Sequence, residues 1–222
     1  MPSGPFSPEL FSFLADLRAN NDRDWFAVNK ERYETHVLEP ALDFVAAFGP
    51  RLEAISPHFV ADPRPVGGSL FRIHRDTRFS KDKSPYKTNL GIFFRHERGR
   101  DVQAPGYYLQ LAPGDCFAGA GIWHPDGKAL KRIRDAIAAD PDGWTEAKRD
   151  QEVIGDSLTR PPAGFDRDHP HIEDIKRKDF AALTRFDQRD TTEPGFVDDY
   201  ARACEGALPL MRFLCRALDV PC

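Results

Sequence analysis

Apolar residues in the first quarter of the chain recur with the period of an α-helix. Ser7 and Pro8 favour a helix start, because a serine hydroxyl can cap the first turn and the fixed φ of proline suits the first helical position. Spacings of three and four residues then separate Leu10, Phe13, Leu14 and Leu17. The pattern predicts this helix, a second over 24–38, and a third that begins at Pro40 and is kinked or split at Gly49–Pro50.

The period changes to two in the middle of the chain. Four short runs favour strands, at 69–75, 89–95, 106–112 and 115–122. Along 89–95, for example, the set Leu90, Ile92 and Phe94 alternates with Gly91, Phe93 and Arg95. Such alternation places two sets of side chains on opposite faces of a strand. Pro113-Gly114 separates the last two runs and predicts a hairpin turn.

Helical spacing returns in the last part of the chain. It predicts helices over about 130–139, 145–154, 180–183 and 196–218. The stretch 159–171 is rich in Pro, Gly and Asp, which indicates an extended loop.

This order of elements predicts an α+β fold with a single domain over residues 1–222. The N-terminal helices would occupy 7–56, a central, mostly antiparallel meander 69–122, and C-terminal helices and loops 126–218. A chain of 222 residues is long enough to bury a core of this kind. Its 17 Phe, 3 Trp and 5 Tyr argue against an intrinsically disordered chain.

Charge and composition narrow the possible classes of protein. The net charge of −4 disfavours a generally basic nucleic-acid binder but leaves room for a local basic patch. No run of about 18 apolar residues occurs, so we expect no membrane-spanning helix and no membrane partner. The N-terminal residues lack the basic and apolar regions of a secretory signal. No CxxC pair occurs among the cysteines, so we expect reduced thiols in a cytoplasmic protein; they are Cys116, Cys204, Cys215 and Cys222.

Residues 72–87 carry a dense cluster of positive charge. The segment RIHRDTRFSKDKSPYK has six basic and two acidic side chains, a net charge of +4. Like charges this close repel one another, so acidic partners or an anionic ligand should offset them. Arginine matches phosphate or carboxylate as a planar fork, and lysine acts as a point charge. The segment therefore predicts an anion-binding site made by Arg72, Arg75, Arg78, Lys81, Lys83 and Lys87.

Other interpretations of this segment stay open. Asp76 and Asp82 can form internal ion pairs that fasten a loop to the sheet, and the charge is then structural. In an anion site the same aspartates would orient the arginines, and Tyr86 would add a hydroxyl at the rim. Six cations spread along an exposed stripe would instead bind nucleic acid or a nucleotide, which the net charge disfavours. A protein-interaction domain would carry an exposed apolar patch.

The run 119–126 is a second candidate for the site. Glycines at a strand end let another group approach the backbone, and Trp123 and His124 directly follow them. These two residues would lie at the pocket rim; alternatively, the glycines permit a tight sheet crossing around a packed Trp. The third glycine of a dinucleotide-binding fingerprint is missing. No nucleophile and base motif occurs, so any catalysis would need acid–base groups such as His74, Asp76, Tyr86 or His124.

An acidic and histidine-rich stretch over 166–174 completes the candidates. His169 and His171 flank Pro170, and neither an HExxH motif nor another metal-ligand spacing occurs. We therefore expect no metal and no cofactor. We expect the acidic side chains of this loop to pair with the basic segment.

Four blocks of the sequence resemble one protein family. They are FRIHRDTRFSKDKSPYKTN, the start of the chain over 6–34, YYLQLAPGDCFAGAGIWHPD over 107–126, and RPPAGFDRDHPHIEDIKRKDF over 160–180. They look like the bacterial and fungal family catalogued as domain of unknown function 2461. The resemblance implies a single cytosolic α+β domain and brings no catalytic residues. The charge cluster, and not the resemblance, leads us to expect a phosphorylated or carboxylated small molecule bound beside the sheet, by a binder or an enzyme.

Overall fold

One antiparallel sheet organises the molecule. The computed structural model describes residues 4–99 and 103–222, and within them six strands lie in the order β1-β2-β3-β4-β6-β5. Their bounds are β1 (Phe59–Val60), β2 (Leu90–His96), β3 (Gly106–Leu111), β4 (Cys116–Ile122), β5 (Val153–Ile154) and β6 (Phe180–Phe186). The meander β2-β3-β4 turns at Pro113-Gly114 between its last two strands. The predicted α+β fold with a central antiparallel meander is confirmed.

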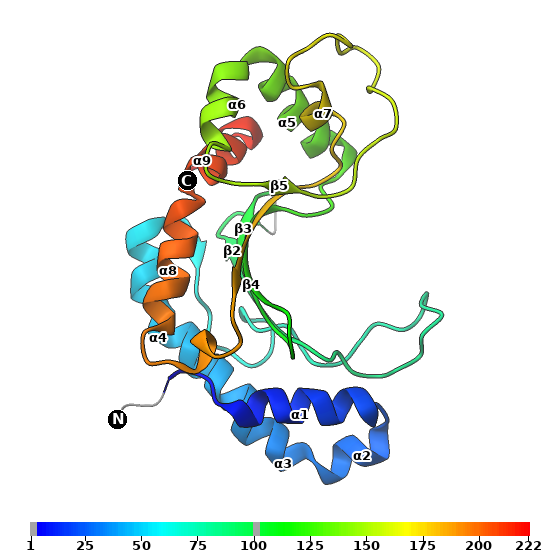
Figure 1. The fold of residues 1–222 in the computed structure, drawn as a ribbon, viewed down its shortest axis with the longest axis vertical. Helices are drawn as coiled ribbons and strands as arrows, with labels where there is room; N and C mark the ends of the chain where they lie inside the picture. The colour runs from blue at the N-terminus through cyan, green and yellow to red at the C-terminus, as the bar shows by residue number, and fades with distance from the viewer. Residues whose placement is uncertain (1–3, 100–102) are drawn as a thin grey trace.

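Helices precede and follow the central strands, as the spacing predicts. Before them come α1 (Pro8–Ala19), α2 (Arg23–Val28), α3 (Lys30–Tyr33), the π-helical turn η1 (Glu34–Leu38) and α4 (Glu39–Ile55). After them come α5 (Gly127–Ala139), α6 (Pro141–Ala147), α7 (Ile172–Ile175), the 3₁₀ turn η2 (Asp190–Thr192), α8 (Phe196–Gly206) and α9 (Leu208–Leu218). Figure 1 shows α4 and α8 beside the sheet, α1–α3 below it, and α5–α7 above it. In the described part of the chain, no helix combines the length and apolar character needed to span a bilayer.

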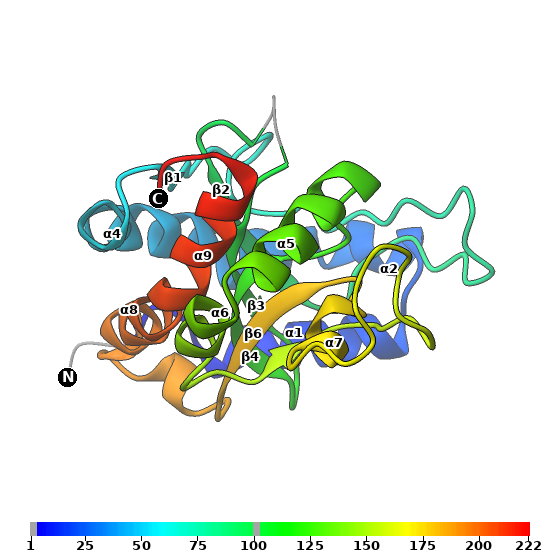
Figure 2. The ribbon, with the colours of Figure 1, turned by 90° about the horizontal axis from the view of Figure 1, so that it is seen from above.

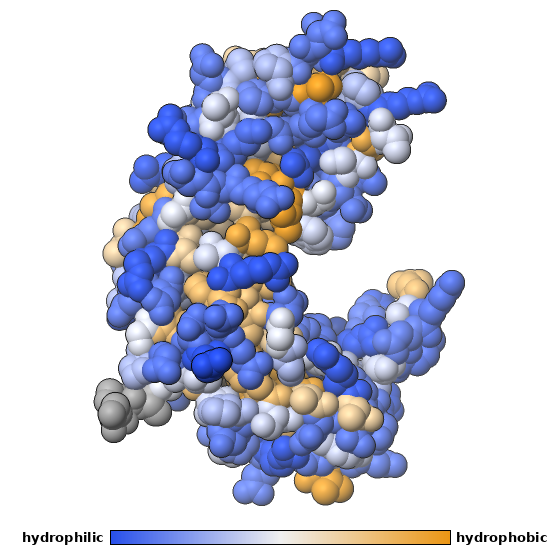
Figure 3. Space-filling view, viewed as in Figure 1, coloured by the Kyte–Doolittle hydropathy of each residue, from blue (hydrophilic) through white to orange (hydrophobic). Residues whose placement is uncertain are grey.

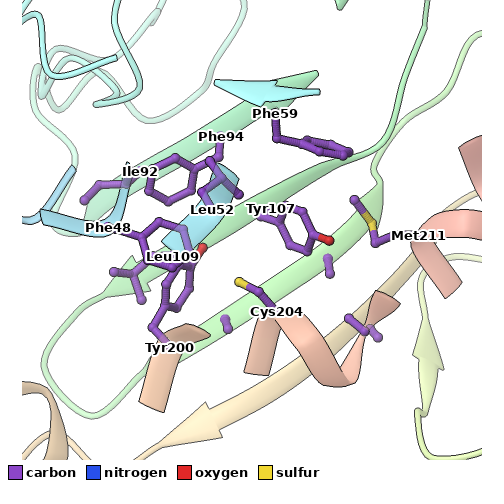
Figure 4. Close-up of a cluster of buried hydrophobic side chains, with 14 of the residues drawn as sticks. Phe48, Leu52, Phe59, Ile92, Phe94, Tyr107, Leu109, Tyr200, Cys204 and Met211 are labelled. Carbon is purple, nitrogen blue, oxygen red and sulfur yellow. The ribbon is translucent and has the colours of Figure 1, made fainter. Parts of the chain in front are cut away.

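One face of the sheet is packed against helices, and we call it the covered face. It carries alternate residues of the strands, among them Ile92, Phe94 and Leu109, which are fully buried. Figure 4 shows these side chains meeting Phe48 and Leu52 of α4 and Tyr200 and Cys204 of α8. Burying such large apolar side chains is the main source of stability in a fold of this size.

The opposite face, which we call the open face, carries glycines and aromatic rings. Its positions include Gly91 and Phe93 of β2, Gly106 and Tyr108 of β3, and Phe117, Gly119 and Gly121 of β4. A Cβ atom at Gly106 would lie 2.4 Å from the ring of Phe93. The ring of Phe93 therefore lies across Gly106, and any side chain at that position would displace it.

The exposed area of the protein is larger than expected for a compact monomer of its mass. The chain exposes 12134 Å², whereas a compact monomer of 25.1 kDa is expected to expose roughly 10,300 Å². Figure 3 shows the molecule hollowed on one side, between its upper and lower parts. The view from above shows residues 72–87 extending on the side of the strands opposite to α4 and α8 (Figure 2).

The predicted strand over 69–75 is wrong. Leu70 bridges Ile92 of β2, and His74 bridges Tyr86, each as an isolated antiparallel bridge. The segment leaves the edge of β2 after Phe71 and then pairs with residues 85–87. Because its two ends pair with different partners, no continuous ladder forms.

The predicted division of the last third into helices and loops missed two strands. Residues 180–183, expected as a helix, belong to β6, and 153–154, expected at the end of a helix, form β5. Alanine and leucine favour helices, but β6 pairs with β4 from Ile122↔Phe180 to Cys116↔Phe186. Pairing along a whole strand overrides the local preference.

Three helix boundaries also differ from the prediction. The expected helix over 24–38 is divided into α2, α3 and η1, whereas Gly49 and Pro50 lie inside an unbroken α4. Phe44, Phe48 and Leu52 of α4 are buried along one side, and their packing keeps the helix continuous. The expected helix over 196–218 breaks at Ala207, so that Pro209 falls in the first turn of α9, where its missing N–H costs no bond.

Candidate functional site

Residues 72–87 form an arm that leaves the sheet edge and returns to it; we call it the basic arm. Its base is a short pairing in which Arg75 N–H donates to Pro85 O at 2.8 Å and Lys87 N–H to Ile73 O at 2.7 Å. Residues 77–85, all of them described, contain neither helix nor strand, as the lack of a period predicts.

Tyr86 anchors this arm to the first helices. Its side chain is buried, and its ring stacks on Phe26 with centroids 4.1 Å apart. The side chain of Asn21 donates to Tyr86 O at 3.0 Å and accepts from Tyr86 N–H at 3.1 Å. Tyr86 was expected at the rim of a pocket; besides this buried packing, it lines a depression of about 860 Å³ together with Arg75 and Lys83.

Both aspartates of the arm pair with its own arginines. Asp76 accepts from Arg78 Nε at 2.9 Å and Nη2 at 2.6 Å, and Asp82 pairs with Arg75. Hydrogen bonds from Arg78 hold the pKa of Asp76 below its ordinary value. Hydrogen bonds from Ser84, and to a smaller extent from Arg75, hold the pKa of Asp82 well below its ordinary value. The arm therefore offsets part of its own charge, as the internal ion-pair interpretation expects.

The six cations of the arm are spread along it. Lys83 Nζ donates to Thr77 O at 2.9 Å, and Lys87 Nζ to Arg72 O at 2.9 Å. Arg75 and Lys87, with Asp76, line a hollow of about 480 Å³ that borders the sheet. Arg75 and Lys83 also line a depression of about 860 Å³ between the arm and the start of α2. The other cations, Arg72, Arg78 and Lys81, lie outside both, and their side chains are exposed.

The open face itself contains a groove of about 610 Å³, which we call the open-face groove. Its lining includes Phe71, Phe93, Tyr108, Phe117, Trp123 and Leu183. Phe71, Tyr108 and Gln110 line both this groove and the hollow beside Lys87. The two depressions therefore share a wall and form one continuous surface.

Aromatic rings form the floor of the groove. Ring centroids are 6.1 Å apart for Phe71 and Phe93, 6.0 Å for Phe71 and Tyr108, and 5.9 Å for Tyr108 and Phe117. Tyr108 lies opposite Gly119 of β4 in the strand register. Because glycine adds no side chain there, the floor stays low enough to admit a flat molecule.

The end of the groove near the basic arm is polar. Tyr108 Oη donates to Gln110 Oε1 at 3.3 Å, and Gln110 Nε2 to Asp115 Oδ2 at 2.6 Å. Asn89 Nδ2 donates to Gln110 Oε1 at 3.4 Å. Burial raises the pKa of Tyr108 to about 12, so its hydroxyl remains a hydrogen-bond donor at neutral pH.

Lys87 brings a positive charge to this polar end. Its Nζ atom lies 5.2 Å from the centre of the Phe71 ring. Burial, and then the charge of Arg72, lower the pKa of Lys87. An ammonium has three protons to donate, and one of them bonds Arg72 O. Lys87 can therefore donate to an anion that enters the hollow.

The comparison with protein families gives a match over most of the chain. The family model described as "Conserved hypothetical protein (DUF2461)" matches residues 9–213. The chain belongs to this family. No curated protein matches it, and no solved structure matches it. The matched residues of this DUF2461 chain include the whole basic arm and every strand of the sheet.

The other end of the groove in this DUF2461 chain lies where β4 meets β6. Trp123 lines the groove and is 55% exposed. The ring centroids of Trp123 and His124 are 5.2 Å apart. His124 Nδ1 lies 3.2 Å from Oδ1 of Asp179, a buried carboxylate. Asp179 was not expected from the sequence, because a helix was predicted over 180–183 and no local pattern indicates the pairing of β4 with β6.

The acidic loop over 166–174 does not neutralise the basic arm, which corrects the expectation. Asp174 accepts from Trp144 Nε1 at 2.8 Å, Lys148 Nζ at 2.6 Å and Arg177 Nε at 3.0 Å. Glu173 pairs with Lys176. Within 4–99 and 103–222, no group of three or more His, Cys, Asp and Glu side chains is placed to hold a metal ion.

Proposed function

We propose that the open-face groove binds a small molecule that joins a flat apolar body to a phosphate or carboxylate group. The observation that carries the proposal is the shared wall of Phe71, Tyr108 and Gln110, which connects an aromatic floor to a hollow. Two cations, Lys87 and Arg75, and one carboxylate, Asp76, line this hollow, and Asp76 is paired with Arg78. A groove of about 610 Å³ has the size of ordinary small-molecule sites.

Each end of the groove has a role in this proposal. The flat body lies on Phe93 and Tyr108, where burial of apolar surface favours binding. The anionic group accepts charge-assisted hydrogen bonds from Lys87 and Arg75. Asn89 and Gln110 add neutral hydrogen bonds between the two ends. Arg72, on the exposed side of the arm, adds long-range attraction for an anion.

A thermal-shift experiment with three probes tests both ends. We expect 1-naphthyl phosphate to raise the unfolding temperature more than 1-naphthol or inorganic phosphate, because it alone occupies the floor and the charged hollow. Lys87→Met should weaken its binding about tenfold or more, since a hydrogen bond to a charged group contributes roughly 1.5–3 kcal/mol. The matched control Lys81→Met removes an exposed lysine of the same arm.

Two results would contradict the proposal. One is the absence of any stabilisation by 1-naphthyl phosphate at millimolar concentration. The other is an equal loss in Lys87→Met and Lys81→Met, which would mean that only the overall charge of the arm matters. A positive result opens a screen of phosphorylated and carboxylated metabolites with the same variants.

A second candidate function is the binding of single-stranded nucleic acid. It is favoured by the exposed side chains of Arg72, Arg78 and Lys81 along an arm that adjoins an aromatic floor, since such proteins combine backbone charge with base stacking. Filter binding of mixed-sequence oligonucleotides at two salt concentrations tests it. Affinity that falls steeply with salt supports this function, and absence of binding at low salt removes it.

A further inference from the structure

His124 has a strained backbone that the fold holds in place. It directly follows β4, and its φ of +51° lies in the left-handed region, which non-glycine residues rarely adopt. Its backbone N–H donates to Asp179 Oδ1 at 2.7 Å. A strained residue that persists is held by its surroundings, and such residues gather at functional sites.

Asp179 is a buried carboxylate that faces this histidine. Its side chain is 1% exposed, and it directly precedes β6, whose Phe180 pairs with Ile122 of β4. Besides the His124 N–H, it accepts the backbone N–H of Asp156 at 3.2 Å. Among the described residues, neither lysine nor arginine pairs with Asp179, so His124 is its charge partner.

Gly155 shows that this arrangement requires close packing. Its φ is +133°, and a Cβ atom there would lie 2.5 Å from the Cβ of Asp179. The chain after β5 therefore reaches the carboxylate only because this position is glycine. The pairing of β4 with β6 and the close approach of Gly155 together hold the Asp179 carboxylate next to the imidazole of His124.

The contact between Asp179 and His124 determines which ring nitrogen of the imidazole carries the proton. A carboxylate 3.2 Å from Nδ1 favours the tautomer with its proton on Nδ1, which leaves the lone pair on Nε2. The His124 side chain is 73% exposed, so that Nε2 is accessible.

We propose that His124, which lies outside the groove lining but next to the groove-lining Trp123, is a general base at this end of the open-face groove and that Asp179 is its positioning residue. This inference rests on the proposed function, because it places the reacting group of the bound molecule in the same groove. The anionic group would lie at the Lys87 end, and the bond to be broken would lie beside His124.

Ester hydrolysis shows how the base would act. Nε2 takes a proton from water while the water oxygen bonds to the ester carbonyl carbon. The bond from that carbon to the leaving oxygen then breaks, and the proton passes from Nε2 to the leaving oxygen. The products are one carboxylic acid and one alcohol, and the imidazole returns to its starting state.

Hydrolysis of 1-naphthyl acetate by the whole chain at pH 8 tests this role. His124→Asn is the main variant, because asparagine tolerates the left-handed backbone and cannot act as a base. His36→Asn is the control, since His36 lies in η1 and outside the lining of the groove. We expect a loss of about tenfold or more in His124→Asn and Asp179→Asn and an unchanged rate in His36→Asn. Thermal unfolding checks that each variant is folded.

A spectroscopic measurement separates positioning from a purely structural role of Asp179. Long-range ¹H–¹⁵N spectra should show the His124 proton on Nδ1, and Asp179→Asn should shift the tautomer towards Nε2–H. An unchanged tautomer would contradict the positioning role.

The outcomes also distinguish this inference from the proposed function. A wild-type rate in folded His124→Asn, with 1-naphthyl phosphate still bound, overturns the catalytic inference and leaves the anion site standing. Hydrolysis that depends on His124 without binding of 1-naphthyl phosphate supports the base and contradicts the anion site.

Discussion

Phe93 and Phe94 follow each other in β2 and lie on opposite faces of one sheet. Phe94 is fully buried on the covered face, with its ring centroid 4.9 Å from that of Phe48. Phe93 is half-buried on the open face, 6.1 Å from Phe71. The same residue type contributes packing on one side and an accessible surface on the other. The comparison teaches that a large side chain becomes core or accessible surface according to whether helices cover its face of the sheet.

The largest expected effect separates these two phenylalanines. Phe94→Ala should cost about 3–5 kcal/mol, because it leaves a cavity in the packed core. Phe93→Ala should cost roughly 1 kcal/mol, because its ring is already in contact with solvent, yet it should weaken binding of 1-naphthyl phosphate. Urea unfolding and thermal shift measure the two effects. Equal losses of stability would contradict the distinction between the faces.

Two glycines of β4 sharpen the comparison on the open face alone. Gly121 has a φ of +137°, and a Cβ atom there would lie 2.1 Å from Phe180 O. Gly119→Ala would meet its nearest neighbour at 3.5 Å, an ordinary contact. We expect Gly121→Ala to cost about 2–4 kcal/mol from strain and displaced strands, and Gly119→Ala less than about 1 kcal/mol. Chemical denaturation of both variants checks this, and a mild Gly121→Ala would show that β4 and β6 separate easily.

The contrast between a buried and an exposed position also applies to two carboxylates, Asp174 and Asp82. Burial raises the pKa of Asp174, but hydrogen bonds from Lys148, Trp144 and Arg177 outweigh it and hold that pKa below its ordinary value. Asp82 makes its ion pair on the exposed arm. Asp174→Asn should cost about 2–3 kcal/mol at pH 7, since it leaves buried donors poorly paired. Asp82→Asn should change the free energy of unfolding much less, because solvent screens its exposed ion pair.

The pH dependence of Asp174 has a definite sign. A carboxyl whose pKa is lowered in the folded state contributes its full stability above the unfolded value of about 4. The contribution is lost as the pH falls through the lowered folded value. The difference between wild type and Asp174→Asn should therefore shrink between pH 5 and strongly acidic pH. A constant difference across this range would mean that the variant acts through packing alone.

The smallest expected effect concerns Lys87 in the absence of ligand. Burial and the charge of Arg72 disfavour its charged form, so Lys87→Met should change the free energy of unfolding by less than about 0.5 kcal/mol, in the stabilising direction. Urea unfolding at pH 7 without added anion measures it. A clear destabilisation would show that Lys87 is a structural residue and not one held free for a ligand.

The parts of the molecule that could be predicted from sequence are those determined by the local spacing of apolar residues and by local charge. The alternation in β2 predicts both faces of the sheet, and the irregular charged run predicts the loop of the basic arm. The strand at 180–183 could not be predicted, because its identity comes from pairing with β4. Asp179 was missed for the same reason. The spread of the arm cations depends on where each side chain points, which residue spacing in a loop does not determine.

An NMR titration with 1-naphthyl phosphate tests the central claim most directly, because it locates the bound molecule. The groove offers two reporters, the methyl groups of Leu183 and the amide of Gly119, and the exposed tip of the arm offers the amide of Phe79. We predict saturable shifts at Leu183 and Gly119, with a smaller change at Phe79. Shifts confined to the arm tip, or no shifts at millimolar probe, would contradict a binding site on the open face.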